Sequence, residues 1–234
     1  MCAMSRATTL LPGAAYAALA IADTVAAGTG RRRLRRVLKP ALMPTLAAAF
    51  HADLRDRGAH PGTRTLRRGT AAAQALSWGG DVALLGTGER ALLTGLGSFL
   101  GAHVAYIAAF SSVRGDTRHY DTAGLKVALG AWATLAPLTS VAAGRRDPAL
   151  RGPVAAYATI LAAMFASSRM LDPALPPEAR RRLQAGTALF LLSDSVLAAQ
   201  MFLLREPRPA LEAVVMATYT ASQGLIAAGV ARAT

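Results

Sequence analysis

The stretch "TALFLLSDSVLAAQMFLL", residues 187–204, decides which solvent surrounds this protein. It is long and apolar enough to cross the hydrocarbon core of a membrane, which takes roughly 17–25 mostly apolar residues. Asp194 nevertheless stands near its middle, where an aspartate costs about 2.5–3.5 kcal/mol on insertion scales. Acids in such places face the interior of a helix bundle and are candidates for function. The stretch therefore predicts a membrane-spanning helix that turns a carboxyl toward its neighbours.

The composition of the rest of the chain is typical of a polytopic membrane protein. Of its 234 residues, 53% are hydrophobic and 17% are charged, against about a quarter charged in a soluble domain. The net charge of +13 could indicate nucleic-acid binding. The arginines, however, cluster between apolar runs, as at 31–36 and 180–182, which fits anchoring at lipid headgroups. We therefore expect a lipid bilayer, and no nucleic acid, as partner. The single cysteine, Cys2, excludes an intrachain disulfide framework.

Eight apolar runs predict an all-α bundle of about eight transmembrane helices, in a single integral membrane domain over residues 1–234. The predicted spans are residues 10–29, 37–52, 70–86, 91–110, 123–143, 153–170, 183–204 and 211–231, with turn-forming residues between them. The first run continues to about Gly28, past any cleavage site of a secretory signal. Gly97 and Gly101 form a GxxxG pair, which favours close helix packing.

An even number of spans places both termini on the same side of the membrane. That side carries slightly more Lys and Arg than the other, which favours the cytoplasmic side of a cell membrane for the termini.

Polar residues of several predicted spans lie at matching depths. Counted at about 1.5 Å per helical residue from the side opposite the termini, these residues are Lys39, Asp81, His103, Tyr157, Asp194, Tyr219 and Gln223. Tyr106 is three residues from His103 and shares its helix face. The pattern predicts a funnel with a lysine at its mouth and carboxylates at intermediate depth, roughly 8–15 Å in from that side. A third deep acid, Asp23, has no polar company and is better explained as a tie between helices.

Several familiar chemistries have no motif in this chain. It contains no GxSxG nucleophile elbow, no HExxH and no P-loop. Its four histidines show no metal-ligand spacing, so we expect neither a metal nor another cofactor. Acid–base catalysis by carboxylates is the enzymatic chemistry that the residues favour.

Five blocks, each on its own predicted helix, resemble the YhhN-like family of integral membrane proteins, which includes the lysoplasmalogenases. The blocks are "VLKPALMP" at 37–44, "LSWGGDVALL" at 76–85, "GLGSFLGAHVAYIAAF" at 95–110, "GTALFLLSDSVLAAQMF" at 186–202 and "VMATYTASQGLIAAG" at 215–229. The family's polar positions match Lys39, Asp81, His103, Tyr106, Asp194, Tyr219 and Gln223. The chain departs from the pattern at Thr220, where a second tyrosine is expected, and Asp23 belongs to no block.

The resemblance implies an ether hydrolase that cleaves the vinyl ether bond of lysoplasmalogens to a fatty aldehyde and a glycerophospho-alcohol. Asp81 and Asp194 are then the expected catalytic pair. One, protonated, donates a proton to carbon; the other, ionised, stabilises the oxocarbenium ion and activates water, as in glycoside hydrolysis. Which aspartate is the acid stays open. Lys39 would meet the substrate phosphate, and the other expected substrate-binding residues are His103, Tyr106, Tyr157, Ser193, Tyr219 and Gln223.

Two alternatives remain. The chain could be a proton-coupled transporter or flippase of lipids or small organic molecules, because acids and histidines in membrane helices often carry protons. Against this, its halves show no inverted repeat. It could also be a non-catalytic lipid-binding protein whose polar groups only hold helices together. The lipid headgroup, the linkage at its sn-1 carbon and the oligomeric state are left open by the sequence.

Overall fold

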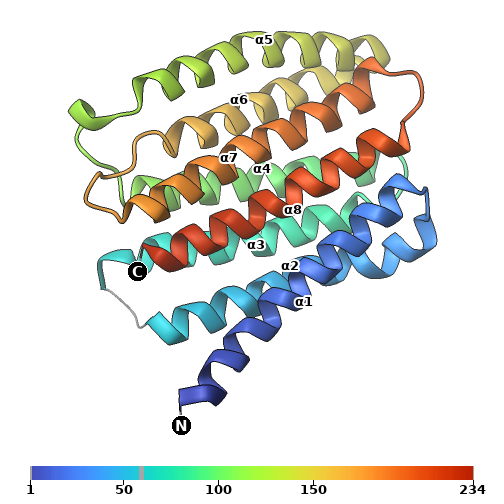
Figure 1. Ribbon diagram of the computed structural model, residues 1–234. Coiled ribbons are helices and arrows are strands. Elements are labelled where there is room, and N and C mark those ends of the chain that lie inside the picture. Colours follow the sequence, from blue (N-terminus) through green and yellow to red (C-terminus); the bar gives the residue numbers. More distant parts are fainter. Residues whose placement is uncertain (1, 58–60, 234) are drawn as a thin grey trace.

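The computed structural model describes residues 2–57 and 61–233, and the side chains of 11–56 and 62–233. In this part of the chain eight α-helices form one bundle without any strand (Figure 1). They are α1 (Cys2–Gly28), α2 (Arg32–Arg57), α3 (Arg64–Ala83), α4 (Glu89–Ser111), α5 (Thr122–Arg146), α6 (Arg151–Ser167), α7 (Pro177–Ala198) and α8 (Pro209–Arg232). A π-helical turn, Ala199–Leu203, extends α7, and short 3₁₀ turns cover Pro61–Thr63, Thr117–His119 and Pro148–Leu150.

Six of these helices are long and apolar enough to cross a membrane by length and composition: α1, α4, α5, α6, α7 and α8. The protein is therefore an all-α polytopic membrane protein. The sequence predicts eight spans, but α2 and α3 do not meet the same criterion. Both helices are long but begin with arginines, and α2 also ends with them. They lie alongside the other helices within the bundle (Figure 1).

Every helix begins earlier than the sequence predicts, and in three of them the added residues include three or more arginines. α2 begins at Arg32 rather than residue 37, α3 at Arg64 rather than 70, and α7 at Pro177 rather than 183. The apolar runs marked only the part of each helix that lies in hydrocarbon. Arginine is a good helix former, and its long stem lets the guanidinium reach the headgroup region from within a helix. Most of the arginine clusters thus lie in helical ends and not in the connections between helices.

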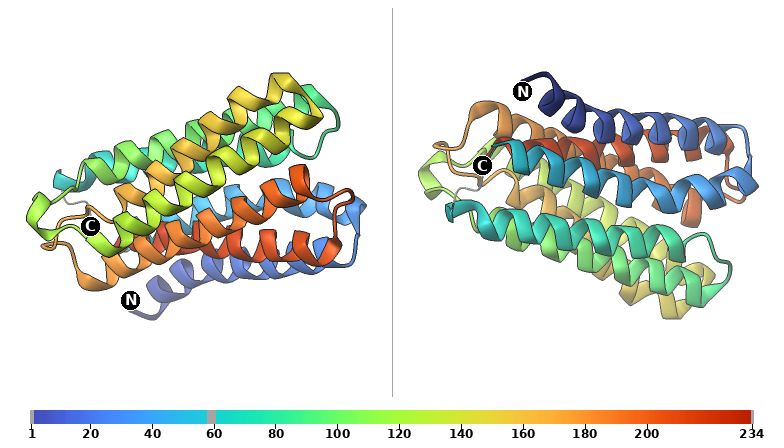
Figure 2. Two further views of the ribbon diagram at one scale, coloured as in Figure 1. Left: turned by 90° about the horizontal axis from the view of Figure 1, so that it is seen from above. Right: turned by 90° about the horizontal axis from the view of Figure 1, so that it is seen from below.

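The eight helices pair with their neighbours in sequence, and α8 is the central element. It packs against α7, α1, α2 and α3, and 56% of its apolar window is buried, compared with 22% for α1. Both ends of the described chain lie at one end of the bundle, which we call the terminal end (Figure 2). The opposite end holds the connections after α1, α3, α5 and α7.

Glycines set the closest helix contacts, but not the pair that the sequence suggests. A Cβ atom on Gly80 of α3 would lie 2.5 Å from the Phe99 ring of α4, and one on Gly186 of α7 would lie 2.7 Å from Ile226 of α8. Nothing lies within 4 Å of a Cβ on Gly97, and Gly101 meets only Leu76 at an ordinary 3.4 Å. The GxxxG prediction is therefore wrong for this bundle, because Gly97 points away from the helix contacts.

Trp78 forms a hydrogen bond to the part of α2 that contains two prolines. Pro44 has no N–H, so the carbonyl of Pro40, one turn earlier, lacks its usual helical donor. Trp78 of α3 donates its Nε1–H to that carbonyl at 2.9 Å. This bond satisfies the carbonyl that Pro44 leaves without a helical donor, and it links α2 to α3.

Candidate active site

Asp81 lies in a buried cluster where α2, α3 and α8 meet. Its Oδ2 accepts a hydrogen bond from the Tyr219 hydroxyl at 2.7 Å, and its Oδ1 lies 3.3 Å from Lys39 Nζ. The Asp81 side chain is 1% exposed and that of Lys39 is 11% exposed. A carboxylate so far removed from water needs a counter-charge and hydrogen bonds, and it has both here. Lys39 lies toward the opposite end, where the sequence places the mouth of a funnel, but it is already paired with Asp81.

Asp194 lies in a second cluster, formed by α4, α6 and α7. Its Oδ2 accepts a hydrogen bond from the Tyr157 hydroxyl. His103 Nε2 lies 3.8 Å from the same oxygen, which is longer than a hydrogen bond. The His103 ring is fully buried, and its Nε2 makes no hydrogen bond to a side chain within the described residues. Asp194 also has no Lys or Arg within ion-pair distance in that part of the chain, so it differs from Asp81 in lacking a fixed cation.

Aromatic rings connect the two clusters. The Phe190 ring meets Tyr219 edge to face at 5.6 Å between centroids, and it meets His103 in the same way at 4.7 Å. Phe99 contacts Tyr219 edge to face at 5.9 Å. No hydrogen bond joins Asp81 to Asp194 directly. Each carboxyl therefore has its own tyrosine, and Phe190 touches one neighbour of each acid.

Tyr106 and Gln223 lie in a hydrogen-bonded chain beneath these clusters. The Tyr106 hydroxyl donates to Gln223 Oε1 at 2.6 Å, and Gln223 Nε2 donates to Ser77 Oγ at 2.9 Å. All three side chains are buried. Sequence reasoning missed Ser77, although it precedes Asp81 by four residues and so shares its helix face. These two hydrogen bonds link α3, α4 and α8.

Ser193 and Asp23 have contacts that leave them outside both clusters. Ser193, expected to contact the substrate, donates its hydroxyl to the Val215 carbonyl at 3.1 Å and is 1% exposed. It holds α7 to α8 and does not line the cavity described below. Asp23 is fully buried, and its Oδ1 lies 3.4 Å from Arg35 Nε. Arg35 also pairs with Glu212, so Asp23 belongs to an ionic tie between α1, α2 and α8.

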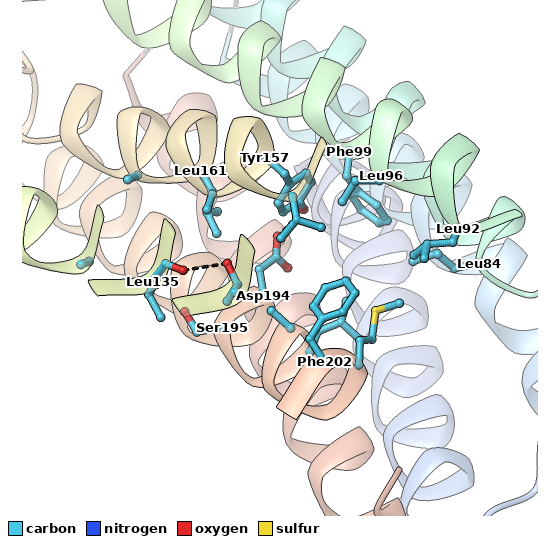
Figure 3. A pocket seen from close by; sticks show the side chains of 18 residues that line it. Leu84, Leu92, Leu96, Phe99, Leu135, Tyr157, Leu161, Asp194, Ser195 and Phe202 are labelled. Atoms are coloured by element: carbon cyan, nitrogen blue, oxygen red, sulfur yellow. Dashed lines mark hydrogen bonds between the residues drawn. The ribbon is translucent and has the colours of Figure 1, made fainter. Parts of the chain in front are cut away.

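An apolar cavity opens beside Asp194 (Figure 3). It has about 60 Å³ of room for the centres of water-sized molecules and is partly open to the surroundings. Leucines and the rings of Phe99 and Phe202 form most of its walls, and Tyr157, Thr139 and Ser195 add hydroxyls. In Figure 3 the Asp194 carboxyl and the Tyr157 ring point toward one another within this cavity. Asp81 does not line it.

A charged cavity, which we call the vestibule, adjoins the apolar one at the opposite end of the bundle. Its cationic lining consists of Arg32, Arg35, Arg36 and Lys39. Leu84, Leu197 and Met201 line both cavities, so the two meet at these side chains. Arg35 and Lys39 are engaged with acids. Arg32 and Arg36 have no carboxylate within ion-pair distance among the described residues. The vestibule is therefore a cationic cavity that adjoins an apolar cavity lined by the Asp194 carboxyl.

The described residues hold no group of three or more His, Cys, Asp or Glu side chains that could bind a metal ion. In the two clusters Asp81 meets Tyr219 and Lys39, and Asp194 meets Tyr157 and His103. Carboxyl, phenol and imidazole groups in such contacts can hold and transfer protons.

Comparison with known proteins gives one match. The model of the YhhN family matches residues 34–230, which is most of the chain and contains all five sequence blocks. The resemblance drawn from those blocks is therefore confirmed. No curated protein and no solved structure matches the chain.

Proposed function

The chain belongs to the YhhN family, and from this premise we propose that it is a membrane-embedded hydrolase that cleaves the vinyl ether bond of lysoplasmalogen-type lysolipids. The products are a fatty aldehyde and a glycerophospho-alcohol. The observation that carries this function is the position of Asp194. It is the carboxyl that lines the apolar cavity, within reach of a bound chain, while Asp81 is closed off behind Lys39 and Tyr219.

The two cavities fit the two halves of a lysolipid. The apolar cavity would receive the hydrocarbon chain of the lysolipid, whose methylenes would find walls as apolar as the lipid tails that they leave. The vestibule offers Arg32 and Arg36 to a phosphate, since guanidinium groups bind phosphate oxygens in pairs. Lys39 adds positive charge from its pair with Asp81. The vinyl ether bond, which joins the chain to glycerol, would then lie where the two cavities meet, at Leu84 and Met201.

Asp194 is the better of the two acids to donate the proton. An unpaired buried charge is costly, and Asp194 lacks the cation that Asp81 has. In its protonated form it would transfer its proton to the vinyl carbon remote from oxygen, and the adjacent carbon and oxygen then share the positive charge. The Asp194 carboxylate then takes a proton from water as that water adds to the cation. The resulting hemiacetal collapses, its hydroxyl proton passing to the glycerol oxygen.

The neighbouring groups have supporting roles in this scheme. Tyr157 donates to Asp194 Oδ2 and so orients the carboxyl toward the cavity. His103, 3.8 Å from that oxygen, is placed to orient the attacking water. Asp81, paired with Lys39, accepts the Tyr219 hydroxyl and so holds that ring in position against Phe190.

The test uses detergent-purified protein and lysolipids that differ only in a vinyl ether, ester or alkyl ether linkage at the sn-1 carbon. Aldehyde should be released from the vinyl ether alone. Asp194→Asn should lower this rate by about 10²–10⁴-fold, the usual contribution of a general acid. The matched control is Glu206→Gln, an exposed acid in the connection after α7 at the same end of the bundle, and it should retain the full rate.

Two results would contradict this function. Aldehyde release by a folded Asp194→Asn protein at the normal rate would remove Asp194 from the chemistry. Absence of any product from the purified wild-type protein, together with uptake of the lipid in vesicles, would favour the proton-coupled transporter instead, because a transporter releases its cargo unchanged.

A further inference from the structure

A groove separate from the candidate active site runs along the outside of the bundle between α2 and α3. These helices lie side by side on the face seen from below (Figure 2, right). At the terminal end the groove is lined by Arg55, Arg67 and Arg68 above a floor that includes Phe50 and Leu54. A second stretch continues it toward the middle of the bundle, lined by Met43, Pro44, Ala47, His51, Ala71, Gln74, Ala75 and Trp78. His51 and Ala71 line both stretches, which are therefore continuous. We call them together the α2–α3 groove.

The groove has the dimensions and small side chains that suit an acyl chain. From Arg68 to Trp78, ten residues of α3 rise about 15 Å, which is half the hydrocarbon thickness of a bilayer. Ala71 and Ala75 leave room along this path, and no other helix covers it. One end of the groove is thus at headgroup level and the other near the bilayer centre.

Positive charge is concentrated at the headgroup end. Within the described residues, no carboxylate lies at ion-pair distance from Arg55, Arg67 or Arg68. The acids of the same helix end, Asp53 and Asp56, do not line the groove. Arginines that are not engaged elsewhere can bind a phosphate through paired N–H donors.

A buried amide below the arginines indicates where a ligand is required. Gln74 lines the deeper stretch, is 1% exposed, and neither Nε2 nor Oε1 makes a hydrogen bond within the described part of the chain. Leaving such a group unpaired costs about 1–3 kcal/mol. It lies six residues, or about 9 Å, from Arg68 along α3, on the hydrocarbon side of the phosphate level. An ester carbonyl of a phospholipid at this depth would accept the Nε2 hydrogen.

We propose that the α2–α3 groove binds an anionic glycerophospholipid of the surrounding bilayer. The headgroup phosphate lies against Arg67 and Arg68, an ester carbonyl bonds Gln74, and an acyl chain follows Ala71 and Ala75 to Trp78. A bound lipid covers the junction of the two helices that are least able to span a membrane by themselves, so it stabilises the folded bundle.

The experiment measures lipid retention by native mass spectrometry on detergent-purified protein titrated with phosphatidylglycerol or phosphatidylcholine of the same acyl chains. Wild-type protein should bind one phosphatidylglycerol about 30-fold more tightly than phosphatidylcholine, since Arg67 and Arg68 near the headgroup contribute about 1 kcal/mol each. Arg67→Gln/Arg68→Gln should remove this preference. The matched control, Arg118→Gln/Arg181→Gln, removes the same charge from exposed sites at the terminal end and should keep it.

Two further variants separate the headgroup from the rest of the site. Gln74→Leu and the groove-filling Ala75→Trp should weaken both lipids, whereas glycerol phosphate in solution should not displace the bound lipid. Equal affinity of the wild-type protein for the two lipids would overturn the site, and so would equal behaviour of the two double arginine variants. Because lipid retention is read without turnover, this outcome is independent of whether the protein is a hydrolase.

Discussion

The buried ion pair of Lys39 and Asp81 allows a stability prediction to be worked from its geometry. The charges lie 3.3 Å apart, which corresponds to about 5 kcal/mol of attraction at an effective dielectric constant of about 20. Removing one partner leaves the other charge buried and uncompensated, which costs about 3–5 kcal/mol. Lys39→Met and Asp81→Asn should each destabilise by that amount. Lys39→Met/Asp81→Asn, which leaves no charge, should be far less destabilised than the two single variants added together.

The assay is thermal unfolding in detergent followed by tryptophan fluorescence. For a chain of this size about 1 kcal/mol shifts Tm by roughly 2–4 °C, so each single variant should lose on the order of 10 °C and the double variant much less. The control is the same cycle on Arg182 and Glu178, whose side chains are 28% and 55% exposed although they lie 2.6 Å apart. That pair should contribute only about 0.3–0.5 kcal/mol.

Additivity would refute the reasoning. If the two single losses simply sum in the double variant, or if the buried cycle gives no larger coupling than the exposed one, Lys39 and Asp81 are not stabilised by each other. Asp81 would then have to be held by Tyr219 alone, and the assignment of Lys39 as its counter-charge would be wrong.

Two other substitutions test the helix contacts that place the site, both measured by thermal unfolding followed by circular dichroism, because Trp78 and Trp132 are the two tryptophans of the chain. Gly80→Ala puts a methyl group 2.5 Å from the Phe99 ring and should destabilise the protein by about 1–3 kcal/mol. The control Gly97→Ala, with open space around it, should be neutral or stabilise the protein by up to about 1 kcal/mol. Equal effects of the two substitutions would contradict the contact between Gly80 and Phe99. Trp78→Phe removes the donor to the Pro40 carbonyl and should cost about 1 kcal/mol. Trp132→Phe, whose exposed indole bonds Thr159, should cost less, and a reversed order would show that the Pro40 carbonyl needs no donor.

Much of the candidate site follows from the sequence because charged residues in apolar runs are conspicuous. Asp81 and Asp194 stand out by composition alone, and counting along each helix gives depth, since the helical rise is constant. The structure places His103 and Tyr157 with Asp194, and Lys39 and Tyr219 with Asp81. These residues come from six helices, at similar depth.

Depth along a helix does not give rotation about its axis or the identity of the neighbouring helix. Ser193 adjoins Asp194 in sequence but turns to the Val215 carbonyl of α8. The sequence assigned the arginines at the start of α2 and α7 to connections between helices. An apolar run shows only which part of a helix suits hydrocarbon, and the helix itself can continue into the headgroup region.

The amino-acid sequence by itself determined that this chain is a helical membrane protein of the YhhN type with acids buried among its helices, because the bilayer imposes apolar length and penalises charge one segment at a time. Only the tertiary structure decided that Lys39 neutralises Asp81 while Asp194 faces the apolar cavity. Which side chains meet depends on how eight helices are rotated and packed against one another, and that is set by contacts between segments far apart in the chain, such as Gly80 with Phe99 and Gly186 with Ile226.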